Sequence, residues 1–438
     1  MAKTTRTRVP FNGVDGLMQA LDEPGRPQTI EFEVAVDAAL DRARLADAVR
    51  TAADLHPMAR ARQVRPKPTD SNYSWEISEK FDNDPVVFTE VSGADEVDKR
   101  RDAFFSRHVG VDRSPPFRVL HVSDPAGDRV MLSVNHTAFD GIGTYRFLQS
   151  ISRAYAGEAD RLPEIDALAA RRNIEKQRPA RRTLGGGGLG GSPTDMFQGL
   201  SRLAPATSEG RPGFSVLHLD MAAADASAPG ATVNDVLVAA LHRTVQAWND
   251  TQGSPTRRVS VMMPVNQRPG PWRGEVLGNF VVPGKVVSSA GDRSNPRRLL
   301  KSVTAQTKSI KTDGVPGAAG VLRPMNVPVL MRGVIPHVID AVSDRSADTA
   351  VMSNLGRAES PPWFGAQGRG LWFSPPPRVP VILTVGAATT DDRLWISLRS
   401  WRPALAPADS RRLADLFLIA IGDLHAGGAS EPTDAWTD

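Results

Sequence analysis

A glycine-rich segment, LGGGGLGGSP (184–193), divides the sequence into two halves of similar length. A segment of this composition has no side chains with which to build a core, so it predicts a flexible connector between two folded units. The length of 438 residues is also more than one ordinary core requires, and it suggests two or three domains. We therefore expect an N-terminal lobe over 1–170, a basic and glycine-rich linker over 171–212, and a C-terminal lobe over 213–438.

Three glycines of this segment, Gly186, Gly188 and Gly191, match the G-x-G-x-x-G spacing of dinucleotide-binding loops. Such a loop needs a strand before it and a helix after it. Here an arginine-rich segment precedes the glycines and Ser192-Pro193 follows them, so the pattern favours a connector.

The run before the glycines, RRNIEKQRPARR (171–182), contains six Lys and Arg residues. A solvated linker is the simpler interpretation. The alternative is a binding surface for anionic phosphates or for an acidic protein partner. No aromatic residues are interleaved with these charges, and the run therefore does not favour nucleic acid as a partner.

Both halves mix strand patterns with helix patterns. The first half predicts a helix over 40–57, a strand over 128–136, and a helix that starts after Gly141 and stops at Gly157. The second half predicts a helix over 231–248, a strand over 257–266, a hairpin over 379–401 with its turn at Thr390-Asp391-Asp392, and a closing helix over 409–424. The expected class is therefore α/β or α+β in two lobes.

The sequence contains no cysteine. Disulfides, thiolate metal sites, iron–sulfur clusters and a cysteine nucleophile are thereby excluded, and the composition fits a reducing cytoplasm. The basic start, MAKTTRTRVPFNGVDG, is not followed by the apolar core of a signal peptide. No run approaches the roughly 18 continuous apolar residues of a membrane span. We expect a cytoplasmic protein without a membrane span.

The segment MLSVNHTAFDGIGTYRF (131–147) holds the strongest candidate site. A buried strand ends there at His136, and Asp140 and Gly141 follow within five positions. A single histidine at a strand end is more often structural than catalytic, so its possible chemistry has to be weighed against that explanation.

Three chemistries use an H-x-x-x-D pattern. A metal site would need further histidine or carboxylate ligands at suitable spacing, and none lies near. A serine hydrolase would need a G-x-S-x-G segment, which the chain lacks. A lone general base needs only a substrate that brings its own nucleophile, and an ordinary imidazole, with a pKa of about 6.5, accepts a proton at neutral pH. Acyl transfer from a thioester to a hydroxyl or amine fits this third chemistry, because the thioester is already reactive.

HTAFDG (136–141) resembles the HxxxDG motif of one acyltransferase superfamily. The superfamily includes chloramphenicol acetyltransferase, peptide-synthetase condensation domains, wax ester synthase/diacylglycerol acyltransferases and mycobacterial polyketide-associated acyltransferases. Other segments resemble it in the expected order: LHPMARAR (55–62), ATVNDVLVAAL (231–241), VMMPVNQRP (261–269), LGNFVVP (277–283) and SNLGR (353–357). Together these segments extend over almost the whole chain.

The resemblance implies two chloramphenicol-acetyltransferase-like lobes that form a V with a tunnel between them. The motif histidine would lie at the middle of the tunnel, with the acyl donor and the acceptor entering from opposite faces. The implied activity is transfer of an acyl group from a coenzyme A or carrier-protein thioester to a hydroxyl or amine. No tightly bound cofactor is then expected, because acyl-CoA or acyl-phosphopantetheine acts as a co-substrate.

Carried over by position, the resemblance makes His136 the general base. Asp140, the second residue of the expected catalytic pair, would point away from the histidine and form an ion pair with an arginine, for which Arg268 is our candidate. Gly141 would let the substrate approach the loop backbone closely.

Four asparagine and serine residues complete the expected substrate-binding set: Asn135, Asn279, Ser353 and Asn354. Ser353 and Asn354 would line the tunnel and orient the acyl group or the oxyanion. Asn279 is explained equally well as a buried residue that caps a turn. No metal ligand is expected.

Two features differ from peptide-forming condensation domains. Asn135 stands where those domains usually have a second histidine, and their late DFGWG-type sequence is missing, although GLWFSPPP (370–377) occupies a similar region. Both differences favour a free-standing transferase that forms esters or amides. A non-catalytic relative that binds a carrier protein or an acyl ligand is the alternative, and a metal-dependent hydrolase is a third possibility.

The sequence leaves the acyl chain, the acceptor and the donor open. Coenzyme A is favoured if the basic run 171–182 meets its phosphates, and a carrier protein is favoured if that run forms an exposed patch. The oligomeric state is open as well: if each chain supplies both lobes, one chain holds a complete site and a monomer suffices.

Overall fold

The computed structural model describes most of the chain. The described residues are 7–162, 199–206, 212–268, 270–272, 274–315, 328–332 and 347–429. The basic run 171–182 and the glycine-rich segment 184–193 lie outside them, as does all of the predicted linker except 199–206 and 212.

The first half of the chain alternates strands with helices. Its elements are β1 (Arg8–Pro10), α1 (Gly13–Leu21), β2 (Thr29–Val36), α2 (Arg42–Leu55), η1 (Pro57–Arg60), β3 (Ala61–Gln63), β4 (Ser74–Ile77), β5 (Val86–Glu90), α3 (Ala94–Phe105), β6 (Phe117–Ser123), β7 (Arg129–Asn135) and α4 (Gly141–Ala156). The predicted strand and both predicted helices are confirmed as β7, α2 and α4. Helix α4 ends at Gly157, whose left-handed conformation (φ 75°) suits glycine best.

The second half contains the other predicted elements. They are β8 (Phe214–Ala222), η4 (Ala223–Ala226), α6 (Val233–Thr251), β9 (Arg258–Asn266), η5 (Gly270–Trp272), β10 (Val281–Ser289), α7 (Ala290–Arg293), α8 (Pro296–Asp313), α10 (Val329–Arg332), β11 (Ala350–Arg357), β12 (Gly368–Ser374), β13 (Leu383–Thr390), β14 (Arg393–Trp401) and α12 (Pro407–Ala429). The predicted hairpin is β13–β14: Thr390 pairs with Arg393, and Asp391 and Asp392 make the two-residue turn.

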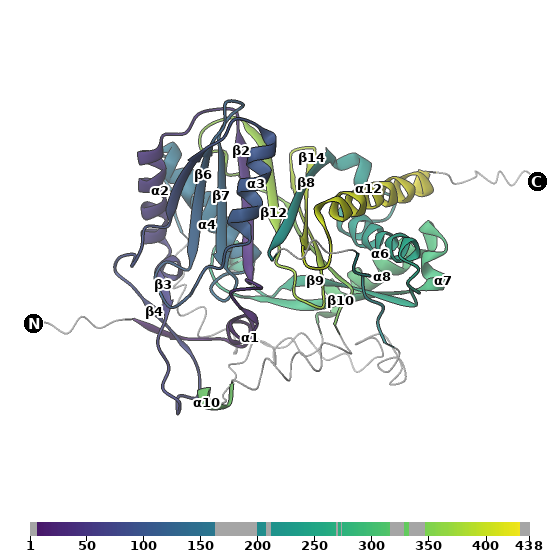
Figure 1. The fold of residues 1–438 in the computed structure, drawn as a ribbon, viewed down its shortest axis with the longest axis horizontal. Helices are drawn as coiled ribbons and strands as arrows, with labels where there is room; N and C mark the ends of the chain where they lie inside the picture. The colour runs from purple at the N-terminus through teal and green to yellow at the C-terminus, as the bar shows by residue number, and fades with distance from the viewer. Residues whose placement is uncertain are drawn as a thin grey trace, which may run out of the picture.

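Two large sheets form the centres of two lobes, which lie side by side in Figure 1. The N-terminal sheet has five strands in the order β12-β2-β7-β6-β5, and the C-terminal sheet has six in the order β10-β9-β11-β13-β14-β8. Helices α2 and α4 pack together in the N-terminal lobe, and α6, α8 and α12 pack together in the C-terminal lobe. A small sheet, β1-β4-β3, adjoins the N-terminal lobe. This is the two-lobed α/β architecture that the resemblance implied.

One strand differs from the predicted division into two halves. β12 belongs to the predicted C-terminal lobe, yet it pairs antiparallel with β2 and completes the N-terminal sheet. The chain then returns to the C-terminal sheet as β13. Gly386 of β13 lies close to the backbone of β12. Glycine is required at this position, because a Cβ would lie 1.8 Å from the carbonyl oxygen of Phe373 in β12. The two lobes are therefore linked by strand exchange as well as by side-chain packing.

Each lobe has its own apolar core, and buried polar groups lie where the two sheets meet. Glu31 of β2 lies 3.6 Å from Arg399 of β14, with both side chains fully buried. Burial raises the pKa of Glu31 to about 7, although the charge of Arg399 acts in the opposite direction. Among the described residues, no helix combines the length and apolar character needed to span a membrane.

Candidate active site

His136 follows directly after β7, in a turn that separates the strand from α4. The backbone N–H of His136 donates to the carbonyl oxygen of Gln28, 2.8 Å away, just before β2 begins. This bond continues the β2–β7 pairing by one residue and fixes the position of the histidine backbone. The side chain is half-buried, whereas Asn135 and Thr137 on either side are fully buried.

Within the part of the chain that the structure describes, the imidazole of His136 is held through one nitrogen. Its Nδ1 lies 3.1 Å from the carbonyl oxygen of Phe139 and 3.2 Å from Oδ1 of Asn279. A carbonyl oxygen only accepts hydrogen bonds, so Nδ1 carries the hydrogen and Nε2 has a free lone pair. Burial lowers the pKa of His136 below its ordinary value, which keeps the ring neutral at pH 7. A neutral ring with an unprotonated Nε2 is the form that a general base requires.

Asp140 forms a bidentate ion pair with Arg268. The two N–O distances are 2.8 and 2.9 Å, and both side chains are fully buried. The backbone N–H groups of Gly143 and Phe280 also donate to the carboxylate. The partner of Asp140 is thus the arginine that the sequence analysis proposed, and the carboxylate is directed toward it and not toward His136.

Asp140 and Arg268 bring three separate segments together at the turn. Asp140 is the N-cap of α4, because its side chain accepts from the backbone of Gly143. The Arg268 guanidinium also donates to the carbonyl oxygens of Val276 and Gly278 and lies 4.5 Å from the centre of the Phe280 ring. The LGN segment (277–279) is therefore fixed directly against the turn at 136–140, which we call the histidine turn.

Asn279 lies in that segment and contacts the histidine turn through both ends of its carboxamide. Its Nδ2 donates to the carbonyl oxygens of His136 and Thr137, both at 2.8 Å, and to Oδ1 of Asp15 at 3.0 Å. Its Oδ1 faces Nδ1 of His136. The structure thus places Asn279 behind the imidazole, on the side opposite to the free Nε2.

Asp15 was not found by the sequence analysis. It lies in the first turn of α1, where it forms a capping box with Asn12, and it is fully buried. The Asn-x-x-Asp spacing in FNGVD (11–15) signals the helix start. Nothing in the sequence signals the contact with Asn279, because 264 residues separate the two positions.

Gly141 has a neighbour that the sequence analysis did not anticipate. A Cβ at this position would lie 2.9 Å from Cζ of Phe373 and 3.6 Å from Cδ2 of Leu355. The space beside Gly141 is thus filled by side chains from β12 and β11. Packing against these two side chains is a reason for glycine at this position, and the close substrate approach that we expected stays a prediction.

The side chain of Asn135, for which we expected a role in substrate binding, is engaged within the protein, and that role stays a prediction. Its Nδ2 donates to Oδ2 of Asp22 and to the carbonyl oxygen of Val109, and its Oδ1 accepts from the backbone of Thr137. Because the side chain is fully buried and both polar atoms are engaged, it holds the neighbouring loops in place.

Ser353 and Asn354 lie next to each other in β11 but have different surroundings. Asn354 accepts from the backbone N–H of Gly356 and so stabilises its own turn. Along this strand Ala350 and Met352 face the C-terminal core. Ser353 and Leu355 therefore face the other way, toward the lobe boundary where Leu355 meets Gly141. Of the two, Ser353 is the better placed to face a substrate.

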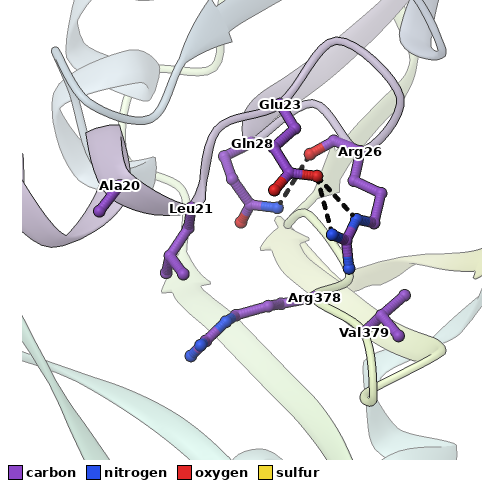
Figure 2. Close-up of a pocket in the computed structure, with 7 residues that line it drawn as sticks. All are labelled: Ala20, Leu21, Glu23, Arg26, Gln28, Arg378 and Val379. Atoms are coloured by element: carbon purple, nitrogen blue, oxygen red, sulfur yellow. Dashed lines mark hydrogen bonds and ion pairs between the residues drawn. The ribbon is translucent and has the colours of Figure 1, made fainter. Parts of the chain in front are cut away.

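Gln28, whose carbonyl oxygen accepts from the backbone N–H of His136, is one of the residues that line a pocket (Figure 2). On one side it is lined by Ala20 and Leu21 at the end of α1 and by Glu23, Arg26 and Gln28 of the α1–β2 loop. On the other side it is lined by Arg378 and Val379 from the β12–β13 connection. Arg26 is ion-paired to Glu23 inside it. His136 does not line this pocket, although the carbonyl of Gln28 holds the histidine backbone. The tunnel expected at His136 stays an expectation.

Within the described ranges, no group of three or more histidine, aspartate or glutamate residues is arranged to hold a metal ion. The histidine turn thus combines a neutral imidazole with a buried ion pair that fixes the turn.

Comparison with known sequences identifies two relatives, both from Mycobacterium tuberculosis. The chain is 34% identical over 362 residues to the uncharacterized Mycobacterium tuberculosis protein Rv2305 of strain H37Rv, and equally to MT2362 of strain CDC 1551. The match extends over 79% of this chain and 83% of the relative. No protein-family model matches the sequence.

Solved structures with the same fold include condensation domains and an acyltransferase. The first condensation domain of the calcium-dependent antibiotic synthetase matches with a TM-score of 0.69 at 15% identity over 97% of this chain and 98% of that one. The starter condensation domain of rhizomide synthetase, in complex with C8-CoA and Leu-SNAC, matches with a TM-score of 0.63 at 14% identity. This match covers 98% of this chain and 96% of that one. The wax ester synthase/diacylglycerol acyltransferase of Marinobacter aquaeolei matches with a TM-score of 0.62 at 16% identity. This match covers 96% of this chain and 100% of that one.

Proposed function

The chain belongs to the family of the Mycobacterium tuberculosis protein Rv2305 and has the two-lobed condensation-domain fold, and from this premise we propose that it is a thioester-dependent acyltransferase. The observation that carries the proposal is the state of His136: Nδ1 is held by two acceptors, burial keeps the ring neutral, and Nε2 is free to accept a proton. The wax ester synthase and the domain crystallised with C8-CoA support acyl transfer on this fold.

In the proposed reaction, the acceptor hydroxyl or amine attacks the thioester carbonyl while its proton passes to Nε2 of His136. The tetrahedral oxyanion then collapses, the C–S bond breaks, and the proton on Nε2 passes to the leaving sulfur. The products are an ester or amide and a free thiol. No tightly bound cofactor is required, because the thioester supplies the activated acyl group.

The other proposed roles follow from the contacts of each side chain. Asp140 and Arg268 fix the turn that carries His136 without touching the substrate. Ser353 is our candidate for a hydroxyl that donates to the oxyanion, since the Asn354 side chain is engaged within its own turn. The donor is acyl-CoA or an acyl carrier protein, and the acceptor is a small molecule. One chain, working as a monomer in the cytoplasm, would suffice for this reaction.

Release of free thiol tests the proposal directly. The protein contributes no thiol of its own because it has no cysteine. We would mix it with acyl-CoAs of graded length and a panel of alcohols and amines, and follow thiol release with a chromogenic disulfide. We expect release by the wild type and by His425→Ala, which changes an exposed histidine on α12, and loss of release in His136→Ala.

Two outcomes would contradict parts of this proposal. Release by a folded His136→Ala variant at the wild-type rate would remove the role of general base. Silence of the wild type with acyl-CoA donors and with acyl groups on a carrier protein would favour the alternative, a non-catalytic protein that binds a carrier protein or an acyl ligand.

A further inference from the structure

Helix α8 exposes a row of positive charges on the C-terminal lobe. Its apolar side chains are buried toward α6, α12 and β10, beside which the helix lies in Figure 1. Its exposed side carries a basic row, which consists of Arg297, Lys301, Lys308 and Lys311. At 3.6 residues per turn these four positions fall within about 80° of one another, and the row extends over about 21 Å at 1.5 Å per residue.

The helix itself does not balance the charge of this row. Asp313, the last residue of α8, is its only carboxylate, and Asp292 before the helix lies 3.8 Å from Arg298. The helices α2, α3, α6 and α12 carry charges of both signs, because each contains at least two aspartates or glutamates beside its basic residues. A face with cations alone therefore distinguishes α8 from these four helices.

The basic row lowers the stability of its own helix. Arg297 and Arg298 lie in the first turn, where the helix dipole disfavours positive charge. Arg297 and Lys301 are four residues apart, and Lys308 and Lys311 are three apart, so each pair of like charges repels on one face. Solvation of a helix does not require such a pattern, whereas binding of a negatively charged partner does explain it.

The length and composition of the row fit an acidic protein surface. Coenzyme A carries its phosphates at one end, so a single molecule would meet only part of a row about 21 Å long. The exposed large apolar residues of the described chain lie outside α8, and the face therefore has no anchor for insertion into a bilayer. The helix also contains no aromatic residue on which a base of a nucleic acid would stack.

The inner side of α8 connects the basic row to the histidine turn. Ile310 packs against β10, with its Cγ2 3.2 Å from the place that a Cβ of Gly284 would occupy. Gly284 follows five residues after Asn279, which contacts His136, so the path along the strand is at most about 17 Å. A phosphopantetheine arm has about the backbone length of five extended residues, about 16–18 Å. The arm and the path are thus similar in length.

We propose that the exposed face of α8 is the docking surface for an acidic helix of an acyl carrier protein, which delivers the thioester to His136. The inference rests on the proposed acyl transfer, and it selects between the two donors that the sequence left open. The basic run 171–182 does not make this selection, because it lies outside the described residues.

Binding of a carrier without any reaction tests the surface. The probes are purified holo acyl carrier proteins that differ in net negative charge, labelled for fluorescence anisotropy. We expect binding that is tighter for more acidic carriers and weaker as salt rises from about 50 to about 500 mM. In Lys301→Glu/Lys308→Glu we expect Kd to rise roughly 10-fold or more, because two attractions become repulsions. Glutamate at 301 stands four residues after Arg297, so the helix should stay folded.

Arg411→Glu/Arg412→Glu is the matched control. It makes the same change in net charge at two exposed arginines of α12. We expect its Kd for the carrier to stay within about twofold of the wild type. An equal loss of binding in both variants would overturn the inference, since the total charge and not the α8 face would then decide. Failure of every holo carrier to bind the wild type at about 50 mM salt would overturn it as well.

Two further measurements separate docking from other roles of these charges. With the same acyl group on a carrier and on coenzyme A, we expect the ratio of the two kcat/KM values, carrier over coenzyme A, to fall roughly 10-fold in the α8 variant and to persist in the α12 variant. An unchanged ratio would contradict docking. Binding of anionic lipid vesicles that depends on Lys301 and Lys308, without binding of carriers, would assign the face to a membrane instead. If the wild type transfers from no donor, the proposed function fails, whereas the Kd values still decide whether α8 docks a carrier.

Discussion

Asp140 and Arg268, which are 128 residues apart in the chain, form a bidentate ion pair in which neither side chain is exposed. The carboxylate accepts from both guanidinium nitrogens and from the backbone of Gly143 and Phe280. A pair with this number of hydrogen bonds compensates the loss of water around two buried charges. The pair therefore connects the histidine turn to the C-terminal lobe.

Removal of one partner should destabilise the protein strongly. Asp140→Ala leaves the Arg268 charge buried without its counter-ion, and we expect the free energy of unfolding to fall by about 3–5 kcal/mol. Arg42→Ala is the matched control, because it breaks the exposed pair with Glu90 and should cost less than about 1 kcal/mol. Denaturant titration measures both. Equal midpoints for the two variants would show that the buried pair is not important for stability.

The pH dependence of the reaction should report the neutral state of His136. Burial lowers the pKa of this histidine, so Nε2 stays unprotonated at pH values below the ordinary value of about 6.5. We expect kcat/KM to stay constant as the pH falls toward and below 6.5, and to decline only when the His136 ring takes up a proton. A profile of kcat/KM between pH 5 and pH 9 measures this. An acidic limb centred above pH 6.5 would contradict it.

A methyl group at position 141 should separate packing from substrate contact. Gly141→Ala places its Cβ against the ring of Phe373, and crowding of this kind costs about 1–3 kcal/mol. Phe373→Leu in the same chain makes room and should recover part of the loss. Gly422→Ala on α12 is the control, since its Cβ meets nothing within 4 Å and should stabilise the helix. Unfolding midpoints test these expectations. Wild-type stability of Gly141→Ala with weakened donor binding would support the substrate-contact role instead.

Local patterns predicted most of the individual elements. The β13–β14 hairpin followed from two β-rich runs around Asp391 and Asp392, and α4 followed from an apolar stripe that stops at Gly157. These features depend on residues close together in the chain, where periodicity and turn chemistry decide the conformation.

Long-range pairing was not accessible in the same way. β12 joins β2 across more than 300 residues, and no local property of GRGLWFS (368–374) distinguishes that partner from a strand of its own lobe. The site shows the same limit. Arg268 was proposed through the family resemblance, whereas Asp15 carries only the signal of a helix cap, although its side chain contacts Asn279 directly.

The buried carboxyl between the lobes should make stability depend on pH. Burial raises the pKa of Glu31 from 4.5 to about 7, against the charge of Arg399 and hydrogen bonds from Thr29 and Ser133. Between these two pH values the folded protein binds a proton that the unfolded chain has released. Stability from this group is therefore full below pH 4.5 and is lost as the pH rises toward and past 7.

Replacement of this carboxyl by an amide should remove that dependence. The difference between 4.5 and about 7 corresponds to about 3 kcal/mol, so the wild type should lose stability relative to Glu31→Gln by about this amount from pH 5 to pH 8. Unfolding midpoints of the two proteins across that range measure the effect. Glu90→Gln, at an exposed carboxylate paired with Arg42, is the control, and its plot of stability against pH should stay parallel to that of the wild type.

A Glu31→Gln plot of stability against pH that runs parallel to the wild type would mean that Glu31 is already ionised in the folded protein at pH 5. The lobes would then meet over a permanent Glu31–Arg399 ion pair, and removal of its negative partner should destabilise the protein at every pH tested.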